Sequence, residues 1–228
     1  MAIELPGRAS RFRDPPMTQI GHVVQALATE IVSLLDKPYV LFGHSMGGLL
    51  AFELTRELRR RRVPLPLHLF VSAHCAPEHS RRTSPVHKLS DAAFIAHLRK
   101  LGGTPPEVLA NQDIMQILLP RLRADWSLLE THEHVVEPPL DVSITALGGI
   151  DDPLSSQQDL ASWSHHTRSS FALRMLPGGH FFLHTAESLV HRTILAQLQS
   201  HHLDTSSASR CGTSLDAEHV HLSFEHRA

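Results

Sequence analysis

The pentapeptide GHSMG, residues 43–47, constrains the fold of this chain more than any other stretch of the sequence. It fits the pattern G-x-S-x-G and lies between a short apolar run, residues 39–42, and an amphipathic run, residues 47–62. A serine in this setting occupies a sharp turn from a strand into a helix, where only glycine fits two positions to either side. The pattern predicts that the Oγ of Ser45 is exposed beside the first N–H groups of a helix. The alternative is a tight turn whose serine has no chemical role.

Short apolar runs alternate with longer amphipathic ones along much of the chain. Predicted strands cover residues 2–5, 39–42, 67–72, 142–147 and 171–176, and predicted helices cover residues 18–36, 47–62, 155–166 and 185–200. This alternation predicts an α/β fold with a mostly parallel sheet flanked by helices. Residues 77–141 interrupt the pattern with helices and loops, so we expect them to form a helical lid over one end of the sheet.

We expect one domain over residues 1–200, followed by a polar tail. Residues 201–228 are rich in serine and histidine and lack helical periodicity, which predicts a disordered segment. The chain has 19 histidines, and several lie in this tail. The spacing of His219, His221 and His226 matches no common pattern of metal ligands. The sequence therefore predicts neither a metal nor a cofactor.

Charge and cysteine content narrow the class of protein. The formal net charge is −2, which argues against nucleic-acid binding and against electrostatic attachment to a membrane. Two cysteines make no disulfide framework, so a reducing compartment fits best. The first residues contain no apolar signal-peptide core, and no apolar run is long enough to cross a membrane. We therefore expect a cytoplasmic protein.

A serine hydroxyl is a weak nucleophile and needs a base, which in turn needs an orienting acid. On a strand–turn–helix of this kind the three groups follow in the order Ser, Asp, His. His180 follows the predicted strand 171–176 through a Gly-Gly turn, and two acids follow the predicted strand 142–147 in the same way. We prefer Asp152 as the acid because it gives a G-x-x-D spacing after Gly149. Asp151 remains the alternative.

These motifs, in this order, resemble the type II thioesterases of polyketide and non-ribosomal peptide assembly lines. The resemblance covers roughly residues 2–200 and rests on these segments: LPGRASRFR, LFGHSMGGLLAFEL, LRKLGGTPPEVL, LLPRLRADWSLLE, LGGIDDP and LPGGHFFL. It implies an α/β-hydrolase fold and a serine thioesterase that removes stalled or wrong acyl groups. The implied partner is an acyl carrier protein or a peptidyl carrier protein, with the acyl group on its phosphopantetheine arm.

The resemblance also implies roles for individual residues. Ser45 attacks the thioester carbonyl, His180 accepts the serine proton, and Asp152 orients His180. The backbone N–H of Met46 is one donor of the oxyanion hole. No cofactor and no metal are implied.

Members of that family usually begin with a further segment that is not found ahead of residue 1 here. It contains the first strand and a loop resembling F-P-x-A-G-G, which supplies the second oxyanion donor. Without it we expect an apolar sheet edge to remain unpaired, and losing one oxyanion donor costs about 3–4 kcal/mol. Two interpretations remain open. The first is a normal thioesterase, of which Met1 is a misassigned start or this chain a fragment, and the second is a weakly active or inactive remnant that binds carrier protein. A small-molecule carboxylesterase is a further alternative.

Overall fold

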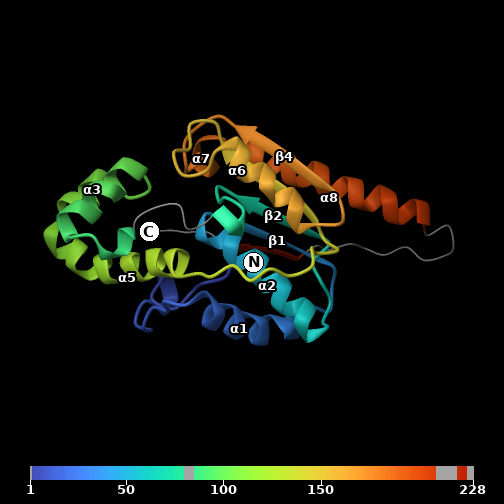
Figure 1. Cartoon of the computed structure of the whole chain (residues 1–228), viewed down its shortest axis with the longest axis horizontal. Coiled ribbons are helices and arrows are strands. Elements are labelled where there is room, and N and C mark those ends of the chain that lie inside the picture. Colours follow the sequence, from blue (N-terminus) through green and yellow to red (C-terminus); the bar gives the residue numbers. More distant parts are fainter. Residues whose placement is uncertain (1, 80–84, 209–219, 225–228) are drawn as a thin grey trace.

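The fold is a parallel sheet covered by helices on both faces (Figure 1). The computed structural model describes residues 2–79, 85–208 and 220–224. Its sheet has the strand order β4-β3-β2-β1-β5, and every pairing in it is parallel. The strands are β1 (Tyr39–His44), β2 (His68–Ser72), β3 (Ser143–Gly149), β4 (Phe171–Leu176) and β5 (Val220–Phe224). The predicted α/β class and the four predicted strands from residue 39 to residue 176 are confirmed.

The two faces of the sheet have separate apolar cores. On one face pack α1 (Ile20–Ile31), α2 (Met46–Arg61) and α6 (Gln157–Ala161), around buried side chains such as Leu41 and Trp163. On the other face, α7 (Phe182–Thr185) and the first half of α8 (Glu187–Ala208) cover Val40, Phe42 and Phe70. The three central strands, β1, β2 and β3, are buried on both sides because helices cover both faces, as is typical of parallel sheets.

The lid is built from three helices and two short 3-10 turns. These are α3 (Asp91–Leu101), α4 (Pro106–Ala110), α5 (Gln112–Glu130), η3 (Pro77–His79) and η4 (Val86–Lys88). They bury an apolar cluster of their own that includes Phe94, Leu98 and Met115. In Figure 1, α3 and α5 extend to one side of the sheet. The remaining short elements are η1 (Ala9–Arg11), η2 (Val32–Leu34) and η5 (Ser162–His166).

The prediction of a strand at residues 2–5 was wrong. Of residues 2–5, only Ala2 takes part in a β-bridge, and no strand forms. The chain then turns at residues 6 and 7. Pro6 has no N–H to donate to a ladder, and Gly7 adopts a positive φ of 87°. The Glu4 carboxylate accepts a hydrogen bond from the backbone N–H of Ser10, so the segment is held as a loop.

The C-terminal region also differs from the sequence prediction. We expected residues 201–228 to lack regular structure, whereas α8 continues to Ala208 and residues 220–224 form β5 beside β1. The edge of β1 that we expected to be unpaired is therefore occupied. An exposed edge of a sheet offers a row of unpaired backbone donors and acceptors, which any extended segment can bind. His219 and His226 lie outside the described residues.

No helix within the described residues is both long enough and apolar enough to cross a membrane.

The turn after β1 is as tight as the motif predicts. Ser45 has a φ of 52° and a ψ of −120°, a strained conformation for a residue other than glycine. A Cβ on Gly43 would lie 2.0 Å from the carbonyl oxygen of Gly47. The backbone N–H of Ser45 donates to the carbonyl of Ser72 on β2, at 2.7 Å, and fixes the turn to the sheet.

This geometry makes Gly43 far less tolerant than a glycine in open space. Because a methyl group at residue 43 meets backbone atoms, we expect Gly43→Ala to lower the free energy of unfolding by about 3 kcal/mol or more. Gly21 in α1 has no atom within 4 Å of an added Cβ, so Gly21→Ala should raise it by about 0.5–1 kcal/mol. Urea unfolding of both variants measures the difference. Equal stabilities for the two variants would contradict this account of the turn.

Candidate active site

Three side chains from distant parts of the chain meet at the carboxyl edge of the sheet. The Nε2 of His180 lies 2.9 Å from the Oγ of Ser45, and its Nδ1 lies 3.0 Å from an Oδ of Asp152. Each residue follows a different strand: β1, β3 or β4. Because the carboxyl ends of parallel strands share one edge, the sheet brings the three predicted residues together.

The carboxylate of Asp152 is buried and well supplied with hydrogen bonds. Besides His180, it accepts from the Ser155 hydroxyl at 2.7 Å and from the backbone N–H of Leu154 at 2.9 Å. Burial alone would raise the pKa of Asp152, but the hydrogen bonds from His180, Leu154 and Ser155 lower it overall. The ionised carboxylate can only accept, so the Nδ1 of His180 carries the proton between them. The Nε2 is then left as an acceptor for the Ser45 hydroxyl.

Asp151, the alternative acid, lies next to Asp152 in the sequence, but the His180 ring lies beside the carboxylate of Asp152. Asp151 is exposed, and its backbone N–H donates to the carbonyl of Gly178. The geometry therefore favours Asp152 over Asp151 as the partner of His180.

A close backbone contact holds the acid loop against the histidine loop. A Cβ on Gly149, at the end of β3, would lie 2.3 Å from the carbonyl oxygen of Gly179 and 2.5 Å from that of Gly178. Only a glycine permits this approach, which sets the distance between Asp152 and His180. The two Gly-Gly turns, at residues 148–149 and 178–179, thus pack against each other.

The first turn of α2 lies beside the hydroxyl of Ser45. Met46 begins the helix and is buried. The first N–H groups of a helix have no partner within it, and they carry a partial positive charge. The backbone N–H of Met46 is thus suited to bind a negative oxygen formed next to Ser45.

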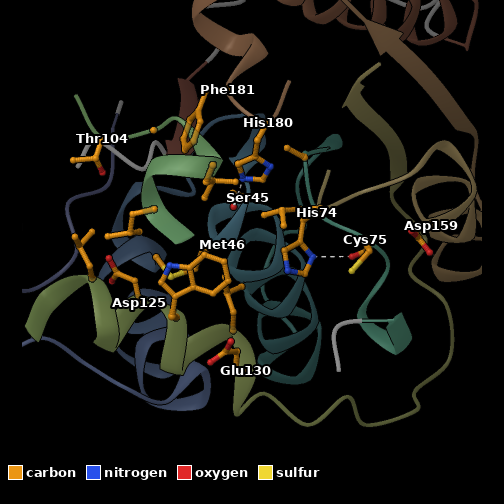
Figure 2. Close-up of a pocket in the computed structure, with 18 of the residues that line it drawn as sticks. Ser45, Met46, His74, Cys75, Thr104, Asp125, Glu130, Asp159, His180 and Phe181 are labelled. Atoms are coloured by element: carbon orange, nitrogen blue, oxygen red, sulfur yellow. Dashed lines mark hydrogen bonds between the residues drawn. The ribbon is translucent and has the colours of Figure 1, made fainter. Parts of the chain in front are cut away.

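A cavity of about 170 Å³ opens from Ser45 and His180 toward the lid. Its lid side is largely apolar and includes Leu98, Leu122 and Trp126. In Figure 2, Phe181 and Thr104 lie toward the top of the view, Asp125 at the left and Glu130 at the bottom. An acyl chain attached at Ser45 would lie against these apolar side chains.

Sequence reasoning missed His74, which also lines the cavity. Its Nδ1 lies 2.7 Å from the carbonyl oxygen of Cys75, so this nitrogen donates (Figure 2). Burial lowers the pKa of His74 to about 4, which keeps the ring neutral near pH 7. The indole N–H of Trp163 donates to the carbonyl of His74 and fixes its backbone. Its place directly after β2 was the signal that could have drawn attention to it.

A partly buried ion pair lies at the cavity wall that α5 forms. Arg8, from the N-terminal loop, contacts the carboxylate of Asp125 on α5. Burial raises the pKa of Asp125, although the charge of Arg8 opposes that effect. Both residues lie in motifs quoted above, LPGRASRFR and LLPRLRADWSLLE, but neither was predicted to be a site residue.

A family model described as "Thioesterase domain" matches residues 1–198. The chain belongs to the thioesterase family. It is thus a thioester hydrolase, and the enzyme class inferred from the sequence motifs is confirmed.

Individual thioesterase-like proteins agree over most of the chain. The gramicidin S biosynthesis protein GrsT of Aneurinibacillus migulanus is 41% identical over 186 residues, covering 82% of this chain and 73% of that protein. The structure of the thioesterase RedJ, from the prodiginine pathway of Streptomyces coelicolor, aligns with a TM-score of 0.75 at 39% identity, covering 79% of this chain and 71% of RedJ. The type II thioesterase BorB, from the borrelidin cluster, aligns with a TM-score of 0.74 at 36% identity, covering 88% of this chain and 79% of BorB.

The two neighbouring acids of this thioesterase provide a matched pair of variants. We expect Asp152→Asn to lower kcat for an acyl-pantetheine thioester by about 10³- to 10⁴-fold, because His180 loses its orienting charge. Asp151→Asn, at an exposed side chain, should stay within about twofold of the parent enzyme. Steady-state hydrolysis, with circular dichroism as a check on folding, measures both. A larger loss at residue 151 than at residue 152 would reverse the assignment.

Proposed function

We propose that this thioesterase hydrolyses acyl thioesters on the phosphopantetheine arm of carrier proteins in polyketide or non-ribosomal peptide assembly. The observation that carries the proposal is the hydrogen-bonded series Ser45–His180–Asp152 at the mouth of an apolar cavity. The similar proteins support the setting, since GrsT, RedJ and BorB are each named for a biosynthetic pathway or cluster. Removal of stalled or wrong acyl groups is the proposed task, and the cytoplasm is the proposed location.

Acylation of Ser45 is the first half of the proposed reaction. The Oγ of Ser45 attacks the thioester carbonyl carbon while its proton passes to the Nε2 of His180. The negative charge that forms on the carbonyl oxygen is stabilised by the backbone N–H of Met46. The C–S bond then breaks, and the pantetheine sulfur leaves as a thiol with the proton that His180 took from Ser45. A thiol has a pKa of about 8.5, so the sulfur needs less help from a general acid than an amine would.

Deacylation repeats the same proton transfers with water. His180 takes a proton from a water molecule, and the resulting nucleophile attacks the acyl-serine ester. The ester bond breaks, the Oγ of Ser45 recovers its proton from His180, and the free acid leaves. Throughout, the ionised carboxylate of Asp152 stabilises the positive imidazole without taking its proton.

The lid supplies the acyl-binding part of the site in this proposal. Leu98 of α3, with Leu122 and Trp126 of α5, faces the cavity that begins at Ser45. An apolar wall gains about 25 cal/mol for each Å² of acyl surface that it removes from water. A Cβ on Gly103 would lie 2.2 Å from the ring of Phe181, so the lid also contacts the loop that carries His180.

The preference between a thioester and an oxygen ester tests this function against a general carboxylesterase. We expect kcat/KM for an acyl group on holo carrier protein to exceed that for the matching oxygen ester by more than about tenfold, a difference of about 1.4 kcal/mol. Ser45→Ala should remove more than about 10³-fold of the carrier-thioester rate. Equal or better hydrolysis of the oxygen ester would favour the carboxylesterase. Parent-level rates in Ser45→Ala would exclude the mechanism.

A further inference from the structure

A second group of polar side chains lies apart from Ser45 and combines histidines with carboxylates. Two overlapping sets, Glu53–His132–His134 and Glu78–His134–His166, each have one ligand atom per residue within 4.8 Å of the others. His134 belongs to both. None of these residues lines the cavity at Ser45. Two imidazoles and one carboxylate form a donor set that Zn²⁺ takes in many proteins.

The Glu53 set is the poorer of the two because its carboxylate is already committed. An Oε of Glu53 accepts a hydrogen bond from Arg56 at 2.8 Å, and both side chains are buried. A cation bound to Glu53 would be repelled by the guanidinium at close range. We therefore base the argument on Glu78, His134 and His166.

In the Glu78 set, the carboxylate is hydrogen-bonded to an imidazole, and a metal ion can take the place of the proton between them. An Oε of Glu78 lies 2.7 Å from the Nε2 of His166. Burial alone would raise the pKa of Glu78, but hydrogen bonds from its own backbone and from His166 lower it overall. Glu78 is thus an ionised carboxylate, the form that binds a cation. A shift of the His166 proton to Nδ1 frees Nε2 for the metal.

His134 contributes a nitrogen that the protein leaves without a partner. Its Nδ1 is buried and makes no hydrogen bond to any described residue. Burial and the neighbouring His166 and Arg56 lower the pKa of His134. A buried polar atom without a partner costs about 1–3 kcal/mol. A ligand at this position would recover that cost.

The imidazole rings of His134 and His166 are close neighbours in an edge-to-face arrangement. The ring centres of His134 and His166 are 5.4 Å apart, with the ring planes at 88°. Phe52 and Trp163 pack against His166. Their ring centres lie 5.1 Å and 5.5 Å from the ring centre of His166. A ligand set that is ordered before the ion arrives loses less entropy on binding.

We propose that Glu78, His134 and His166 form a binding site for a divalent transition-metal ion of the Zn²⁺ type. The three protein ligands leave a fourth position for water, because Glu78 lies at the surface. Glu78 belongs to η3, His166 ends η5, and His134 lies on the connection from α5 to β3. The ion therefore ties the segment that leaves the lid to the body of the enzyme. The sequence predicted no metal, so this proposal goes beyond the sequence prediction.

Zn²⁺ titration of the full chain tests the site. Competition with a chromophoric chelator gives the affinity of the tightest site for Zn²⁺ in the parent, in Glu78→Gln and in His134→Ala. We expect each substitution to weaken it by about tenfold or more, since changes even to residues behind metal ligands weaken binding 10- to 100-fold. The chain contains 19 histidines, so His191→Ala, at an exposed residue of α8, serves as the matched control and should leave the affinity unchanged.

Thermal unfolding gives a second readout that does not depend on hydrolysis. Zn²⁺ should raise the unfolding midpoint of the parent and of His191→Ala relative to a chelator-treated sample, and this rise should be absent in Glu78→Gln. Glu78→Gln keeps the size of an exposed side chain and thus decides the question even if His134→Ala fails to fold. The proposal is overturned if Glu78→Gln binds Zn²⁺ as tightly as the parent, or if His191→Ala weakens binding by the same factor.

Discussion

The hydrogen bond between Ser45 and His180 joins residues that are 135 positions apart in the chain, and the proposed chemistry depends on it. The contact exists because β1 and β4 are parallel members of one sheet and end at the same edge. The strained turn aims the Ser45 hydroxyl at that edge, and the contact at Gly149 sets the acid loop against the histidine loop. The apolar cores on the two faces hold this edge rigid, so the three side chains need no large rearrangement to meet.

Much of this arrangement could be predicted from the sequence because the relevant signals are local. Apolar runs and amphipathic periods indicated the central strands and the helices, and G-x-S-x-G indicated the turn. The positions of Asp152 and His180 after strands indicated that they would share an edge with Ser45. The choice between Asp151 and Asp152 was harder, since both follow the same strand. It depended on which side chain the turn directs inward, which one residue of spacing decides.

The features that were missed depend on contacts between segments far apart in the chain. His74 looks ordinary in the sequence, and only the fold places its neutral ring in the cavity wall and the indole of Trp163 on its carbonyl. The group around His134 draws on η3, η5 and the connection from α5 to β3, and its spacing follows no local ligand pattern. The pairing of β5 with β1 had no local signal either, because an open edge accepts many sequences. Trp163 contacts both His166 and the His74 backbone, so one buried residue packs between a candidate metal ligand and a residue of the cavity wall.

The central claim is that the Ser45 hydroxyl becomes acylated, and the most direct measurement is the mass of the peptide that carries the acyl group. The enzyme is mixed with an acyl-carrier thioester, quenched in acid during turnover, digested and analysed by tandem mass spectrometry. The account predicts one added acyl group on Ser45 that disappears as the substrate is exhausted. Cys75, in the same cavity wall, is an internal comparison within the same digest. Hydrolysis that proceeds with the acyl group on Cys75, or with no acyl group on Ser45 at any time, would contradict the account.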